Sequence, residues 1–127
     1  MRGFVDPTDP VEVEEVLASA VPGFGLQGVL DQLAAVPGLP IRPGRPGGLL
    51  RRPEPATIDV DDRRLSITDE GRATLQHIVG GVVLATDRVA PRDLPGMLAA
   101  MLTRAVAQLT SADQLSVILT SMRDALV

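Results

Sequence analysis

The sequence lacks the residues on which most metal and redox chemistry depends. It has no cysteine and a single histidine, His77, so it offers neither a disulfide framework nor a thiolate nucleophile. Zinc and haem sites are built from imidazole or thiolate ligands. We therefore expect no metal, no cofactor and no enzymatic activity. His77 is expected to make one hydrogen bond beside an apolar stripe, and a hydrolase centred on it is a minor alternative.

Tryptophan, tyrosine, lysine and asparagine are also absent, and Phe4 and Phe24 are the only aromatic residues. The missing types other than tryptophan have AT-rich codons, whereas the abundant alanine, glycine, proline and arginine have GC-rich ones. A GC-rich genome explains this bias. A chain of 127 residues with 45% hydrophobic residues predicts one globular domain, 1–127, with an aliphatic core.

No long hydrophobic run is present. The longest, Ile78 to Ala85, contains two glycines and is too short to cross a bilayer. The N-terminus becomes acidic where a secretion signal would be apolar. These features predict a cytoplasmic protein with no membrane partner.

Residues 37–56 differ from the rest of the chain. They carry four arginines and one glutamate, a net charge of +3, in a chain of net charge −4. Pro37, Pro40, Pro43 and Pro46 recur at every third position, which matches the three-residue turn of polyproline II. The segment is expected to be irregular, either a mobile linker or an arm that docks on something. Its Pro-x-x-Pro-x-Arg strings make Pro37–Pro46 a candidate ligand for a protein partner.

Two helices are predicted before this segment. Asp9 precedes Pro10 as an N-cap, and an apolar stripe follows until Pro22-Gly23. A second, short helix is predicted from about Leu26 to Val36.

A β-hairpin and three helices are predicted after it. Thr57–Val60 and Arg64–Ile67 alternate around the turn formers Asp61-Asp62. The first helix would run from Thr68 to about Val89, with Gly80-Gly81 either tolerated inside it or marking a break. The second would run from Asp93 to about Leu109, and the third would begin at Ser111 in a capping box. The predicted fold class is α+β and mainly α, with five helices and one hairpin.

The last two helices carry apolar stripes along their whole length. If other elements leave these stripes uncovered, a second copy of the chain would cover them. We therefore expect a non-enzymatic protein-interaction or oligomerisation module that forms a homodimer through these helices. The candidate interface residues are Leu98, Met101, Leu102, Leu115, Ile118, Leu119 and Met122.

A second interpretation rests on a resemblance. Gly48-Leu49-Leu50-Arg51-Arg52, the hairpin and Ile67-Thr68-Asp69-Glu70-Gly71-Arg72 resemble the wing of bacterial winged-helix repressors of the multiple-antibiotic-resistance type. The similarity covers about residues 48–126, and the helices that follow resemble the dimerisation arms of those repressors. It implies a divergent DNA-binding transcriptional regulator.

In that interpretation the wing-tip Arg63 and Arg64 would contact phosphate or the minor groove, and Arg51 and Arg52 would add backbone contacts. The recognition helix expected before Gly48 is absent, because prolines and glycines occupy its place.

Overall fold

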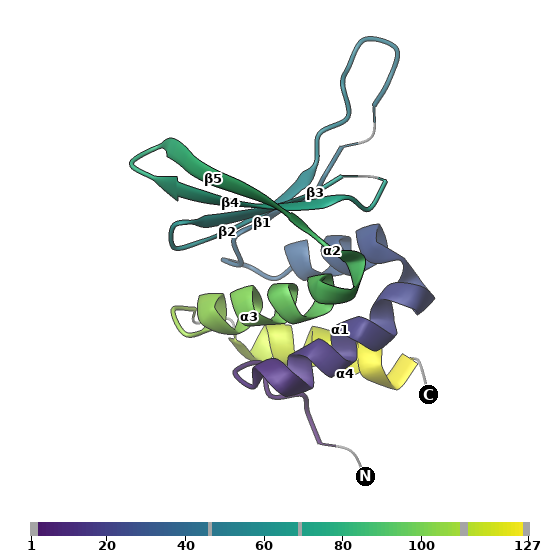
Figure 1. Cartoon of the computed structure of the whole chain (residues 1–127). Coiled ribbons are helices and arrows are strands. Elements are labelled where there is room, and N and C mark those ends of the chain that lie inside the picture. The colour runs from purple at the N-terminus through teal and green to yellow at the C-terminus, as the bar shows by residue number, and fades with distance from the viewer. Residues whose placement is uncertain (1–2, 46, 69, 110–111, 126–127) are drawn as a thin grey trace.

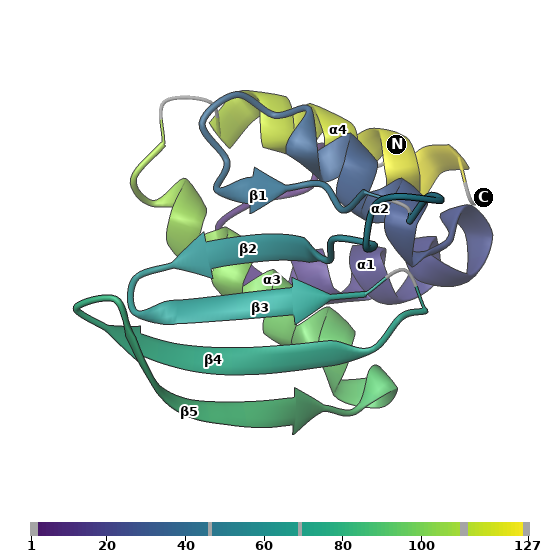
Figure 2. The ribbon, with the colours of Figure 1, turned by 90° about the horizontal axis from the view of Figure 1, so that it is seen from above.

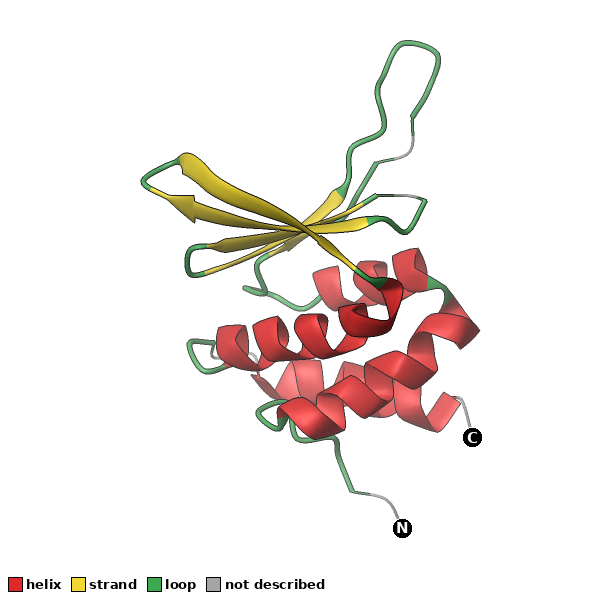
Figure 3. Ribbon diagram, viewed as in Figure 1, coloured by secondary structure: helices red, strands yellow, loops and turns green. Residues whose placement is uncertain are grey.

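The helices lie on one face of an antiparallel sheet, and the other face of the sheet is open (Figures 1 and 3). The computed structural model describes residues 3–45, 47–68, 70–109 and 112–125. The α-helices of these ranges are α1 (Pro10–Phe24), α2 (Leu26–Ala34), α3 (Leu94–Val106) and α4 (Ala112–Ala125), and a 3-10 turn, η1 (Pro91–Asp93), precedes α3. The strands are β1 (Ile41–Arg42), β2 (Ala56–Val60), β3 (Arg63–Ile67), β4 (Ala73–Val79) and β5 (Val82–Val89).

The sheet is a simple meander, because its strands follow one another in chain order from β1 to β5 (Figure 2). Each strand pairs antiparallel with the next. Such neighbours need only short connections. One connection, between β1 and β2, is much longer than a hairpin turn requires, and it forms a projecting arm.

The N-terminal helices confirm the pattern from which they were predicted. The Asp9 carboxylate accepts hydrogen bonds from the backbone amides of Val11 and Glu12, which caps α1. The predicted apolar stripes of α1 and α2 are buried. The predicted end of this helix at Pro22-Gly23 is wrong: α1 continues through Pro22 to Phe24, and Gly25 follows as the C-cap with a φ of 77°.

The predicted fold class of five helices and one hairpin is wrong. The helix expected from Thr68 to Val89 is instead the pair of strands β4 and β5. Gly80 and Gly81 have φ values of 58° and 81°, and they form the two-residue turn between these strands. The β-branched valines on either side of the glycines favour a strand over a helix. The domain is therefore a five-stranded sheet with four α-helices in the described residues.

The segment 37–56 is more ordered than predicted. Leu39 and Ile41 are buried, and Ile41 pairs with Ile58 of β2. Pro40 precedes this strand and its carbonyl accepts a hydrogen bond from the Asp59 amide. Part of the segment thus joins the sheet, while Pro37 and Pro43 remain exposed. Pro46 lies outside the described residues.

The β2–β3 hairpin was predicted correctly. Asp61 and Asp62 form its turn, and Asp61 takes the left-handed conformation with a φ of 54°, which aspartate tolerates better than most residues. Ile58 lies opposite Leu65, and both side chains are buried against the helices.

The core is aliphatic and lies between the helices and the inner face of β2 and β3. Helices α1 and α3 pack on each other, α2 packs on β1, and α3 packs on β2. None of the buried side chains in the described ranges is polar or charged. The largest fully buried side chains come from both layers: Leu17, Leu30, Leu33, Ile58, Leu65, Ile67, Leu98, Leu102, Leu115, Leu119, Met122 and Val5.

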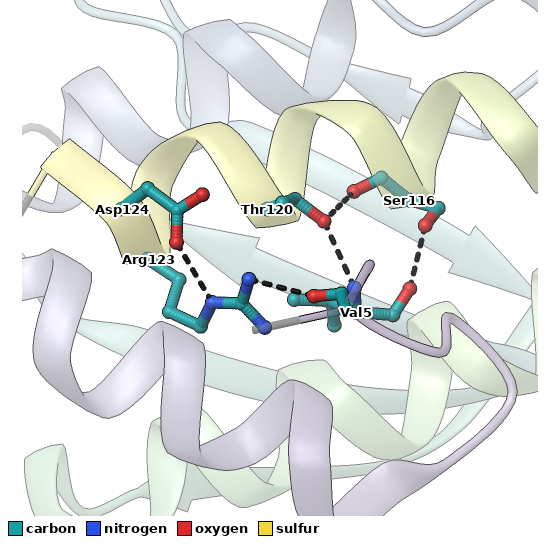
Figure 4. Close-up of polar contacts among 6 residues, drawn as sticks. Val5, Ser116, Thr120, Arg123 and Asp124 are labelled. Atoms are coloured by element: carbon teal, nitrogen blue, oxygen red, sulfur yellow. Dashed lines mark hydrogen bonds and ion pairs between the residues drawn. The ribbon is translucent and has the colours of Figure 1, made fainter. Parts of the chain in front are cut away.

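The N-terminal segment is fastened to α4 by a small set of polar contacts (Figure 4). The Thr120 hydroxyl accepts a hydrogen bond from the Val5 amide at 2.9 Å, and the Ser116 hydroxyl donates to the Val5 carbonyl at 2.6 Å. Arg123 donates to the Gly3 carbonyl at 2.7 Å. These contacts satisfy the backbone of a segment that has no strand partner, so the Val5 side chain can be fully buried.

Helix α4 begins at Ala112, and the predicted capping residue Ser111 lies outside the described residues. Across the helices that the structure describes, none has the length and apolar character needed to cross a membrane.

Burial of α4 inside the monomer predicts a clear stability effect. Leu115 is fully buried, whereas Val117 on the same helix is 55% exposed. Leu115→Ala should lower the free energy of unfolding by about 2–5 kcal/mol through a core cavity. The matched control Val117→Ala should change it by no more than about 0.5 kcal/mol. Urea denaturation followed by circular dichroism measures both, and equal stabilities for the two variants would contradict this packing.

Candidate interaction site

The residues expected to form a dimer interface are in the core of the monomer. Leu98, Met101 and Leu102 of α3 are buried against the other helices and the sheet. Leu115, Leu119 and Met122 of α4 are also buried, and Ile118 is partly buried against the same core. The apolar stripes are therefore covered by this chain itself.

The four arginines expected to contact DNA do not share one surface. Arg63 and Arg64 are consecutive in β3, so their side chains point to opposite faces of the sheet. Arg64 pairs with Asp59 at 2.6 Å, and Arg63 lines a groove on the helix side. Arg51 and Arg52 lie in the arm at the other end of β2.

The resemblance to repressors also requires a long helix after Thr68, where this chain forms β4. Asp69 of that motif lies outside the described residues.

The second half of the sheet extends beyond the helices. All of β5 except Val89 is exposed, and β4 is mostly half-buried. β5 is the last strand in the sheet order, and no described strand pairs with its outer edge. Toward its turn the β4–β5 hairpin rises away from α3 (Figure 1). Its backbone amides and carbonyls along this edge are free to pair with another chain.

The end of this hairpin is apolar on both faces, with Val79, Val82 and Leu84 on one face and Val83 on the other. Val79 precedes the Gly80-Gly81 turn, and Val82, Val83 and Leu84 follow it. Each of these four side chains is 49–60% exposed. We call them the hairpin patch. Single exposed aliphatic residues are common, but four of them on adjacent strands are characteristic of an interaction surface.

A groove separates the overhanging sheet from α3. It has a volume of about 620 Å³. Its apolar lining comes from Val60, Leu75 and Met97, together with Ala100 and Met101. Methionine adapts its shape to different partners, which suits a surface that accepts another chain.

An ion pair and a hydrogen bond mark the polar side of the groove. Asp61 pairs with Arg104 of α3, which links the β2–β3 turn to the helix layer. Asp62 lies 2.6 Å from Nε2 of His77 in β4. The hydrogen bond from His77 lowers the pKa of Asp62 below its ordinary value of 3.8, against the opposing effect of desolvation. The His77 side chain makes a hydrogen bond as expected, but from a strand and not from the predicted helix, and it joins the β2–β3 turn to β4.

These groups do not make a metal site. Among the described residues, no cluster of three or more histidine, aspartate or glutamate side chains has the geometry to bind a metal ion.

Sequence reasoning missed the hairpin patch, because its residues fell within the helix predicted from Thr68 to about Val89. The signal that identifies it is the Gly80-Gly81 pair between two β-branched runs, which is typical of a two-residue hairpin turn. The groove gives no local signal in the sequence. Its walls come from residues about 40 positions apart in the chain, on β2–β3 and α3.

The contact between Asp62 and His77 predicts a pH effect of defined sign. Its stabilising contribution is present above the ordinary pKa of 3.8 and is lost as the pH falls through the lower pKa of the folded state. His77→Ala should raise the pKa of Asp62 toward 3.8 in a carboxyl carbon NMR titration. Asp6 is an internal control, since the Thr8 hydroxyl lowers its pKa elsewhere in the chain. An unchanged Asp62 titration in the variant would disprove the assignment.

Comparison with known proteins gives a family but no described activity. Neither the curated proteins nor the solved structures contain a match to this chain. The sequence model of one family matches residues 5–126, which is nearly the whole chain and includes every helix and strand described above. The chain therefore belongs to the family described as a domain of unknown function, DUF5073.

Proposed function

We propose that this domain is a non-enzymatic interaction module that forms a homodimer through the outer edge of β5 and the hairpin patch. The free edge of β5 is the observation that carries the proposal. This strand has eight residues, and its exposed aliphatic residues would lie beside the side chains of an added strand. Long apolar edge strands are templates for pairing with another chain.

A second copy is the partner that this edge fits most simply. Two identical edge strands pair antiparallel around a twofold axis, and each copy then provides the same residues to the other. The pairing would join two sheets into one, and Val82 and Leu84 of each copy would lie beside side chains of the other copy on one face of the joined sheet, with Val83 on the opposite face. This surface replaces the C-terminal helices, whose apolar residues are already buried within the monomer.

The non-enzymatic part of the proposal is supported by the state of the titratable groups. Catalytic groups typically lie in clefts where burial shifts their pKa values. Every titratable side chain in the described ranges is at least partly exposed, and the two resolved pKa shifts are due mainly to local hydrogen bonds. His77 is held by Asp62 in a surface contact.

Self-association should depend on the hairpin patch. Val82→Lys/Leu84→Lys should weaken the association constant by at least about tenfold, because two unpaired ammonium groups would be buried at the interface. Analytical ultracentrifugation over a range of concentrations measures the change. Val117→Lys is the matched control, since Val117 is similarly exposed but lies on α4.

Circular dichroism should show that all three proteins are folded. A wild-type chain that remains monomeric at several hundred micromolar would refute the homodimer, and so would a double variant that associates as strongly as the control.

A further inference from the structure

The connection between β1 and β2 is built as a narrow two-legged arm. Its outer rung joins Gly48 and Arg51 by backbone hydrogen bonds of 3.1 and 3.3 Å. Its inner rung joins Arg45 and Glu54 by two backbone bonds of 2.9 Å. The arm rises from the sheet on the side away from the helices (Figure 1). These rungs define a projection with a two-residue tip, Leu49-Leu50.

Glycines bring the two legs together at the base of the arm. A Cβ atom on Gly44 would lie 2.8 Å from the Glu54 carbonyl oxygen and 2.9 Å from the Ala56 amide nitrogen. A Cβ atom on Gly47 would lie 3.0 Å from Cδ of Pro53. The approach at Gly44 is possible only without a side chain, and at Gly47 a side chain would require Pro53 to shift. Together with Pro53 and Pro55, it reduces the freedom of the connection, so that the tip is presented at a defined place.

The tip is entirely apolar and entirely exposed. The exposed fractions of Leu49 and Leu50 are 105% and 99%, the highest of any large hydrophobic residue that the structure describes. No neighbouring side chain fixes their orientation. A protein pocket binds apolar groups through matched shape, whereas lipid chains accept them in any orientation. Two unsupported leucines at the end of an arm therefore fit a lipid surface better than a shaped pocket.

Positive charge surrounds the tip. Arg51 and Arg52 follow the leucines directly, and Arg45 and Arg42 lie toward the base. Glu54 is the only acidic residue of the segment, and its carboxylate is 4.0 Å from Arg45. The arm is thus strongly basic in a chain whose net charge is −4. A basic residue near an anionic bilayer strengthens binding about fivefold, and combining it with an apolar insert gives more stable attachment than either alone.

We propose that the arm docks the domain on membranes rich in anionic phospholipid. Leu49 and Leu50 enter the boundary between headgroups and acyl chains, and Arg45, Arg51 and Arg52 bind the lipid phosphates. This attachment needs no membrane-spanning helix, and it departs from the sequence-based expectation of no membrane partner. It is independent of the proposed homodimer, because the arm and the β4–β5 turn lie at opposite ends of the sheet (Figure 1).

The absence of tryptophan makes a direct test practical. Leu49→Trp places a single tryptophan at the tip, and Val117→Trp places a single tryptophan on α4 as a control. With vesicles of phosphatidylcholine containing about one-quarter phosphatidylglycerol, the fluorescence emission of the tip variant should shift to the blue, and that of the α4 variant should not. Equal or absent shifts in the two variants would refute insertion of the tip.

Vesicle co-sedimentation of the otherwise unlabelled chain provides the second measurement. Leu49→Ser/Leu50→Ser should weaken binding at least about tenfold, and Arg51→Gln/Arg52→Gln should weaken it by a similar factor. Raising the salt from about 0.05 M to about 0.5 M should also release the protein. Arg88→Gln and Val117→Ser are the matched controls and should bind as the wild type does.

Four outcomes would overturn the proposal: no binding of the wild type, unchanged binding of either arm variant, equal binding to pure phosphatidylcholine, or loss of self-association in Leu49→Ser/Leu50→Ser. The last would show that the tip docks on a second copy and not on lipid. Because the variants of the hairpin patch keep the arm intact, they should still bind vesicles even if the homodimer proposal fails.

Discussion

One cluster of buried aliphatic side chains, shared by the helices and the inner face of β2 and β3, holds this domain together. Leu102 of α3 belongs to it with Ile58 and Leu65 of the strands, and Leu17 extends it to α1, which packs on α3; all four are fully buried. No aromatic residue contributes to the described buried core. Branched aliphatic side chains fill the space at high density without polar atoms to satisfy, so the core imposes few constraints besides shape.

The helices cover only part of the sheet. Helix α2 packs on β1 and α3 packs on β2, whereas all of β5 except Val89 is exposed. β4 pairs with β3 and β5 pairs with β4, and the contact of Asp62 with His77 joins β4 to the β2–β3 turn. A β-hairpin supported by its neighbours can remain folded while its outer edge is exposed. The free edge is therefore a consequence of the limited helical cover.

The sequence predicts the elements that local residues specify better than those that depend on partners far away in the chain. Helix α1 is specified locally, by the Asp9 cap and an apolar stripe, and it was predicted correctly except for its end. The stretch 73–89 was misread because its apolar residues also fit a helical period, and the glycines at 80–81 were taken either as tolerated inside that helix or as a break in it. Strand formation depends on pairing with other strands. Here the pairing of β4 with β3 and with β5 favours strands over the helix that the apolar period also allows.

The candidate sites likewise divide into those that a local pattern indicated and those that only the folded chain reveals. The unusual composition of residues 37–56 marked an arm that docks as one alternative, and a basic projecting arm is present. The apolar stripes of α3 and α4 indicated buried surface correctly, but a stripe does not reveal whether its own chain or another one covers it. The groove beside α3 depends on the fold as a whole and had no counterpart in any local pattern.

The fastening of Gly3 and Val5 to α4 has a practical consequence for handling the protein. Both ends of the described chain lie in the helical layer, while the arm rises from the opposite face of the sheet (Figure 1). An affinity handle or fluorescent protein joined to α4 would hang beneath the helices and leave the sheet unobstructed. Immobilisation through that handle would orient every molecule with its strands and arm toward the solution.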